Sequence, residues 1–228
     1  MRNLQNALTL KQLYQLKQIG YRYTNLYLSE IQNNIKKKHL SSKKKDIQTV
    51  EYSRANILNC SLCQLSKSRL NVIDGGGNSD ADIMFILDSP TYLQESSNRL
   101  FIGNSSQMLI NMIENVLLIP KSQIYFTHIV KCRPPNAQPI TPTQAHSCLP
   151  YLHKEIELVK PKIIVTIGGE AYKYLTGDNR SIADVRGTQI KKNGYTIIPT
   201  FHIKYLLRNP SAKRYVFEDM KLVRSLIP

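Results

Sequence analysis

The chain has 228 residues, enough for one core of ordinary domain size and an extension. Its 31 Lys and Arg outnumber 16 Asp and Glu, and the net charge of +15 indicates a polyanionic partner: nucleic acid first, an anionic membrane surface second. A lysine-rich proteome is the alternative source of this charge. No apolar run approaches the ~20 residues that span a bilayer. No secretory signal is recognisable, so the expected location is cytoplasmic, where thiols stay reduced.

The first part of the chain is the most basic. Residues 1–55 carry 11 basic and 3 acidic side chains, and lysines fill positions 36–38 and 43–45. Upstream, apolar residues from Leu4 to Ile19 recur at helical spacing, and Gly20 follows them. We therefore predict a basic helical extension and linker over 1–55 and a main domain over 56–228. The linker either contacts phosphates or is a solvated tail.

The main domain alternates strands with helices. Four short runs rich in β-branched or aromatic residues predict strands: Ile83–Leu87, Ile124–Val130, Ile163–Ile167 and Thr196–Thr200. Helices are expected at Ser105–Leu118, Pro142–Val159, Glu170–Leu175 and Lys213–Leu226. This order predicts an α/β fold, a three-layer sandwich with a mainly parallel four-stranded central sheet. Ligands of such sheets bind at the carboxyl ends of the strands. The segments expected to carry the site are Asp88–Tyr92, Lys131–Pro135, Gly168-Gly169 and Phe201–Arg208.

The cysteines of the chain are Cys60, Cys63, Cys132 and Cys148. The first two form a Cys-x-x-Cys pair on one turn of backbone, and the fold must bring in the other two. Such a quartet of thiolates can hold a tetrahedral zinc ion or a [4Fe–4S] cluster, and the spacing does not decide between them. Two disulfides or scattered buried thiols are the alternatives, although disulfide frameworks are typical of small secreted domains.

The third cysteine lies in a distinctive motif, Lys131-Cys132-Arg133-Pro134-Pro135. Other short motifs accompany it: Leu100-Phe101-Ile102-Gly103, Gly168-Gly169-Glu170-Ala171, Arg186-Gly187, Thr200-Phe201-His202 and Leu206-Leu207-Arg208. From Asn59 to its end the chain resembles the family 4 (iron–sulfur, thermophilic-type) uracil-DNA glycosylases of the uracil-DNA glycosylase superfamily. The resemblance implies a uracil-DNA glycosylase-like domain whose cysteine quartet holds a structural [4Fe–4S] cluster. It also implies a DNA-repair enzyme that hydrolyses the N-glycosidic bond of uracil, or a related deaminated base, in single- or double-stranded DNA.

Three positions of the expected pocket differ from that family. The first motif reads Leu87-Asp88-Ser89-Pro90-Thr91 where the family has Gly-Glu-Ala-Pro-Gly, so an acid is kept but both glycines are replaced. His128 stands four residues before Cys132, where the family carries an Asn that reads the uracil edge. Ile203 follows His202 where the family has proline, which frees a backbone angle of that loop.

Base excision assigns roles to the residues of this pocket. The base must be extruded from the stack and held, so we expect Phe101 to stack on it and His128 to bond its edge, with a weaker hydroxyl contact from Ser89. Cleavage needs a negative group near the sugar and a donor near the leaving base, which predicts Asp88 and His202 as catalytic residues. The alternatives are structural: Phe101 as a core residue, His128 as a structural histidine, Asp88 as an Asx-turn residue and His202 as a turn residue.

A segment near the end of the chain is expected to meet the DNA. Leu206 and Leu207 resemble a wedge that fills the gap left by an extruded base. The basic side chains expected at phosphates are Lys204, Arg208, Lys213 and Arg214. An amphipathic helix with a solvated basic face is the alternative. For Lys131 and Arg133 the sequence does not separate phosphate contact from neutralisation of a cluster.

Two other functions remain open at this level. One is a DNA-binding member of the superfamily that is non-catalytic or has altered specificity, which the changed pocket favours. The other is a zinc-bearing nucleic-acid-binding protein.

Overall fold

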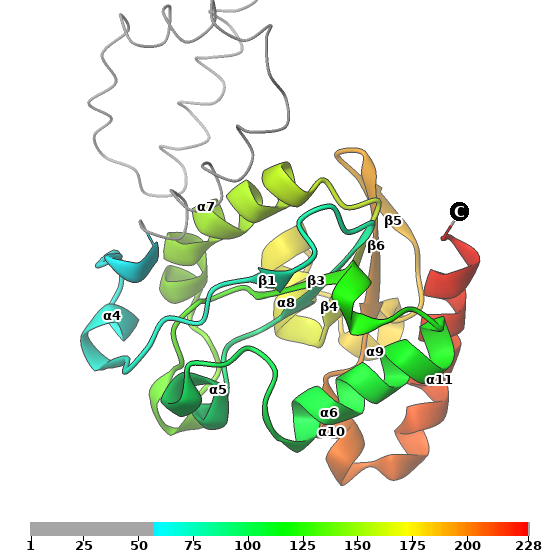
Figure 1. Cartoon of the computed structure of the whole chain (residues 1–228), viewed down its shortest axis with the longest axis horizontal. Helices are drawn as coiled ribbons and strands as arrows, with labels where there is room; N and C mark the ends of the chain where they lie inside the picture. The colour runs from blue at the N-terminus through cyan, green and yellow to red at the C-terminus, as the bar shows by residue number, and fades with distance from the viewer. Residues whose placement is uncertain (1–56, 228) are drawn as a thin grey trace, which may run out of the picture. The chain divides into compact units, whose positions relative to one another are not determined.

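Figure 1 shows the computed structural model, which describes residues 57–227. The predicted extension over 1–55 lies outside the described residues. The described part of the chain forms one sheet of six strands in the order β1-β3-β2-β4-β6-β5. The strands are β1 (Gly76–Gly77), β2 (Ile83–Leu87), β3 (Ile124–His128), β4 (Ile163–Ile167), β5 (Ile190–Lys192) and β6 (Tyr195–Thr200).

The centre of the sheet is parallel, as predicted. β2 pairs in parallel with β3 and β4, and β4 pairs in parallel with β6. These four strands consist largely of Ile, Val and Phe and are buried on both faces, which is typical of parallel strands. The two short edge strands, β1 and β5, pair antiparallel with β3 and β6 and were not predicted.

Helices cover both faces of the sheet, which confirms the three-layer sandwich (Figure 1). One face packs on α7 and α8, and the other on α6, α10, α11 and a π-helical turn at Ile113–Leu117. Side chains alternate accordingly along β2, where Met84 faces the first core and Phe85 the second. The helices are α4 (Leu65–Ser68), α5 (Tyr92–Ser97), α6 (Gly103–Met112), α7 (Pro142–Val159), α8 (Gly169–Thr176), α9 (Ile182–Val185), α10 (Ile203–Arg208) and α11 (Lys213–Ser225).

Local sequence explains where the longer helices begin and end. α7 starts at Pro142 because Thr141 and Gln144 form a capping box, each bonding the other's backbone N–H. The predicted helix Ser105–Leu118 is interrupted, because α6 gives way to the π-helical turn, and Leu118 ends it in a left-handed conformation. Within residues 57–227, no helix is long and apolar enough to cross a membrane.

The register of the strands gathers their carboxyl ends at one edge of the sheet. Leu87, the last residue of β2, lies opposite His128, the last residue of β3. Ile167 of β4 lies opposite Thr200 of β6, and the N–H of Gly168 donates to the Thr200 carbonyl at 2.8 Å. The segments that leave the sheet here are those predicted to carry the site.

Candidate active site

An aspartate and a histidine from opposite parts of the chain meet at this edge. Nε2 of His202 lies 3.2 Å from Oδ1 of Asp88, and the same oxygen accepts the N–H of Ser89 at 2.8 Å. Burial alone would raise the pKa of Asp88, but the hydrogen bond and charge of His202, the Ser89 N–H and the charge of Lys204 together lower it to about 2. The carboxylate is therefore ionised at neutral pH.

The backbone fixes the tautomer of His202. Its Nδ1 accepts the N–H of Lys204 at 3.0 Å, so that the imidazole caps the first turn of α10. An acceptor at Nδ1 leaves the proton of the neutral ring on Nε2, which donates it to Asp88. No sequence pattern predicts this tautomer, because the group that orients the ring is a main-chain amide.

Gly168 leaves the space that the His202 ring occupies. It has a φ of +98°, and a Cβ there would lie 3.0 Å from both Cβ and Cδ2 of His202. A side chain at this position would therefore strain the backbone and push the imidazole away from Asp88. The double-glycine turn after β4 thus supports the contact between His202 and Asp88.

The pair opens onto a cavity that contains the predicted base-binding residues. Asp88 and His202 line it together with Ser89, Phe101 and His128. The Phe101 ring is half-buried and stands edge-on to Phe126, with centroids 4.6 Å apart and an interplanar angle of 84°. The remaining lining side chains are Leu87, Thr91, Gln94, Leu100, Ser105, Ser106, Leu109, Phe126, Ile203 and Lys204.

His128 is the most unusual group in this cavity. Its side chain is 0% exposed, and neither ring nitrogen has a hydrogen-bond partner within the part of the chain that the structure describes. Burial, and after it the charge of Lys131, lowers the pKa of His128 to about 3, so the ring is neutral. Buried polar atoms are normally hydrogen-bonded, so two unpartnered nitrogens on a residue of the cavity wall make His128 a candidate ligand-binding group.

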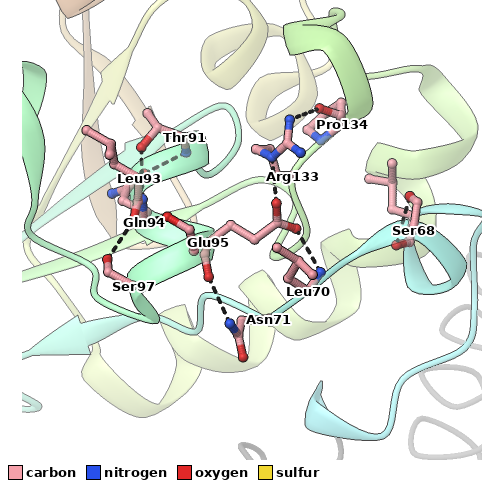
Figure 2. Close-up of polar contacts among 12 residues, drawn as sticks. Ser68, Leu70, Asn71, Thr91, Leu93, Gln94, Glu95, Ser97, Arg133 and Pro134 are labelled. Atoms are coloured by element: carbon pink, nitrogen blue, oxygen red, sulfur yellow. Dashed lines mark hydrogen bonds and ion pairs between the residues drawn. The ribbon is translucent and has the colours of Figure 1, made fainter.

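Lys131 and Arg133 each form an ion pair with a buried carboxylate. Nζ of Lys131, 1% exposed, lies 2.6 Å from Glu155 Oε2 and also bonds Thr127 and the His128 carbonyl. Nε of Arg133 lies 2.6 Å from Oε2 of the buried Glu95 (Figure 2). Lys131 is thus unavailable to phosphate and braces the strand end that carries His128. Glu95 and Glu155 were not predicted, because isolated acids in helices carry no motif.

Residues 75–221 match the uracil DNA glycosylase superfamily. The chain belongs to this superfamily. It is 33% identical over 188 residues to the type-4 uracil-DNA glycosylase of Sulfurisphaera tokodaii, covering 79% of this chain and 86% of that protein. It is 34% identical over 184 residues to the type-4 uracil-DNA glycosylase of Thermotoga maritima, covering 79% and 95%. A DNA polymerase of Bacillus phage SP01 is 26% identical over 153 residues, which cover 67% of this chain and 16% of the polymerase.

The residues predicted to contact DNA divide into two groups in this superfamily member. Lys204, Leu207, Arg208, Lys213 and Arg214 are exposed, and Leu207 is 46% exposed. Leu206 is 0% exposed and packs in the core beneath α10, so its prediction as part of a DNA wedge is wrong. Two successive helical residues point in different directions, and only one of them can leave the core.

The cysteines of this superfamily member are free thiols without disulfides. Two sulfurs accept hydrogen bonds: Cys132 from Arg69 at 3.5 Å and Cys148 from the Lys131 N–H at 3.4 Å. Cys63, Cys132 and Cys148 pack in the same core. Within residues 57–227, no group of three or more His, Cys, Asp or Glu is arranged to hold a metal ion. Four free cysteines with N–H donors at their sulfurs are nevertheless a donor set that suits an iron–sulfur cluster.

Proposed function

We propose that the protein is a DNA glycosylase that hydrolyses the N-glycosidic bond of uracil, or of a related deaminated base, in DNA. The observation that carries this proposal is the cavity into which the ionised Asp88, its partner His202 and the unpartnered His128 all project. Membership of the superfamily and the likeness to type-4 uracil-DNA glycosylases support it. The basic side chains around α10 and α11 suit a DNA partner.

The base would be held by two side chains of different character. An enzyme that acts on a base in DNA must first take it out of the stack. Phe101, half-buried in the cavity wall, offers an aromatic surface for the flat base. The neutral His128 offers one donor and one acceptor nitrogen to the base edge, and a hydrogen bond there would satisfy a group that burial leaves unpaired.

Bond cleavage would use the two oxygens of Asp88 differently. Oδ1 accepts from Ser89 and His202, whereas within residues 57–227 Oδ2 accepts no hydrogen bond. Oδ2 can therefore orient the attacking water and accept the proton that this water loses as it bonds to the sugar, and the carboxylate charge stabilises the cationic sugar that forms as the bond breaks. The Nε2–H of His202 donates to Asp88 in this structure. As the oxygen of the leaving base becomes negative, the same N–H can donate to that oxygen instead.

We also propose that Cys60, Cys63, Cys132 and Cys148 hold a [4Fe–4S] cluster. When bound, the cluster would cross-link the segment before β1 to the loop after β3 and to α7, and it takes no part in the hydrolysis. The hydrogen bonds donated to two of the sulfurs support this assignment.

Cleavage of defined oligonucleotides tests the proposed function. Purified protein is incubated with single- and double-stranded oligonucleotides that carry one uracil, hypoxanthine or xanthine, and alkali then breaks the strand at abasic sites. We expect breaks at uracil. Asp88→Asn keeps both hydrogen-bond acceptor contacts of Oδ1 but removes the charge, and should slow cleavage about 100-fold or more while DNA affinity is unchanged.

Asp82→Asn is the matched control, because Asp82 is half-exposed at the opposite end of β2 and its side chain pairs with the exposed Lys162. This variant should cleave like the unchanged protein. Absence of breaks with every base, together with salt-sensitive DNA binding, would replace the glycosylase with a non-catalytic DNA-binding protein. Normal cleavage by Asp88→Asn would contradict the role of the carboxylate.

A further inference from the structure

A second hollow adjoins the base cavity and has no role in the mechanism above. We propose that it binds the base of the nucleotide next to the extruded one on the same DNA strand. This proposal rests on the proposed function, since the extruded base must occupy the cavity at Asp88. Its walls are Tyr92, Arg133, Pro134 and Pro139, with Glu170 at one side, and its volume is about 440 Å³. That volume lies within the usual range for small-molecule sites.

The two hollows share part of their lining. Both are lined by Asp88, Ser89 and Thr91 from the segment after β2, and by His202 and Lys204 from the start of α10. A nucleotide strand whose base enters the first hollow must therefore pass the mouth of the second. The proposed occupant is a part of the substrate itself, because the DNA backbone already brings the neighbouring nucleotide to this hollow.

Tyr92 is the aromatic surface of this second hollow. Its side chain is 62% exposed, although it is large and partly apolar, so it contributes little to the core. It is the first residue of α5, directly after the cap Thr91. Thr91 and Gln94 form a capping box, and the Gln94 side chain also donates to the Leu100 carbonyl. The backbone that carries the exposed ring is thus firmly anchored.

Arg133 extends this surface. Its guanidinium carbon lies 5.5 Å from the centroid of the Tyr92 ring. The guanidinium is held there by Glu95, which is 1% exposed and whose other oxygen accepts the N–H of Leu70 at 3.2 Å (Figure 2). Arg133 also donates to the Pro134 carbonyl at 3.3 Å. Because the arginine is fixed over one face of the Tyr92 ring, the other face of this exposed ring is the one on which a base can stack, whatever its sequence.

The charges around the hollow favour a base over a phosphate. Glu170 and Asp88 place carboxylates in the lining, and the positive charge of Arg133 is paired with Glu95. A phosphate would meet repulsion from these acids, whereas a neutral base would meet a tyrosine ring, two prolines and the side chain of Gln138. The exposed Lys204 lies at the boundary of the two hollows, where the linking phosphate would pass.

A comparison of one variant with three substrates tests the proposal. Each single-stranded oligonucleotide carries one uracil, and two of them lack the base on the 5′ or on the 3′ neighbour. Tyr92→Ala should lower kcat/KM about tenfold on the complete oligonucleotide, as expected for loss of one stacked base. On one of the two oligonucleotides that lack a neighbouring base, Tyr92→Ala and the unchanged protein should have the same kcat/KM. Tyr92→Phe keeps the ring and should behave like the unchanged protein.

Phe217→Ala is the control, because Phe217 is also an exposed aromatic ring, 45% exposed with Lys221 above it, but lies on α11 outside this hollow. It should change none of the three rates. A loss by Tyr92→Ala that is the same on all three substrates, or no loss on any, overturns the proposal. Fluorescence anisotropy measures the affinity of the same proteins for the same oligonucleotides, and so tests the stacking site without cleavage. If the unchanged protein cleaves none of the oligonucleotides, the proposed glycosylase function fails, and the affinities still test the stacking site.

Discussion

At the scale of single residues, the chemistry of His128 sets the expected base preference. Uracil presents an N–H donor and a carbonyl acceptor side by side, and a carboxamide can bond both at once. A neutral imidazole carries one donor and one acceptor on opposite sides of its ring, so it can bond only one of them. His128→Asn should therefore raise kcat/KM for uracil relative to 3-methyluracil, which lacks that N–H, by about tenfold, the value of one added hydrogen bond.

The ratio of the two kcat/KM values, measured on single-stranded oligonucleotides, checks this prediction. His153→Asn is the control, because His153 is exposed on α7 and outside the cavity. An unchanged ratio in His128→Asn would show that His128 does not read the base edge.

Most residues of the candidate site could be named from the sequence, but their states could not. Asp88 and His202 follow parallel strands and His128 ends one, and such positions meet at one edge of the sheet. The proton position on His202 depends on the main-chain N–H of Lys204, and the unpaired state of His128 depends on what surrounds it. Main-chain groups and empty space leave no pattern in a sequence.

At the scale of elements, α10 combines an exposed leucine, proposed to contact DNA, with a buried one that packs in the core. Leu207 is exposed and Leu206 is fully buried. Leu207→Ala should leave the free energy of unfolding within about 0.5 kcal/mol. It should reduce cleavage of uracil in double-stranded DNA about tenfold and affect single-stranded DNA less, because only a duplex has a gap to fill.

Leu206→Ala supplies the matched comparison. It should lower the free energy of unfolding by about 2–5 kcal/mol, measured by urea denaturation, because it opens a cavity in the core. If Leu207→Ala cleaves both substrates normally, the exposed leucine is not a wedge, and the basic residues around it alone would account for DNA contact.

The short elements explain why the sequence predicted only part of the architecture. α5 and α10 have six residues each, too few to show a helical period, and β1 is two glycines. The central strands could be predicted because each is a run of five or six residues, mostly β-branched or aromatic.

At the scale of the whole molecule, the cysteines lie in segments that the sheet does not connect. Cys60 and Cys63 precede β1, Cys132 follows β3, and Cys148 lies in α7. A cluster bound by all four would restrain these segments in the folded state, and binding to the folded state alone adds to stability. Cys148→Ser should therefore lower the iron content from about four atoms per chain. It should also lower Tm by several degrees, since 1 kcal/mol shifts Tm by about 2–4 °C in a domain of this size.

Iron analysis, visible absorbance and thermal unfolding of anaerobically purified protein check this prediction, with Ser147→Ala as the control on the half-buried neighbour of Cys148. The control should keep colour, iron and Tm. A colourless protein with one zinc ion per chain would replace the cluster with a zinc site. Equal iron content and Tm in Cys148→Ser would remove Cys148 from the ligand set. The proposed chemistry does not use the cluster. Cys148→Ser should therefore lose activity only in proportion to the fraction of protein that is unfolded, and its kcat per folded molecule should be normal.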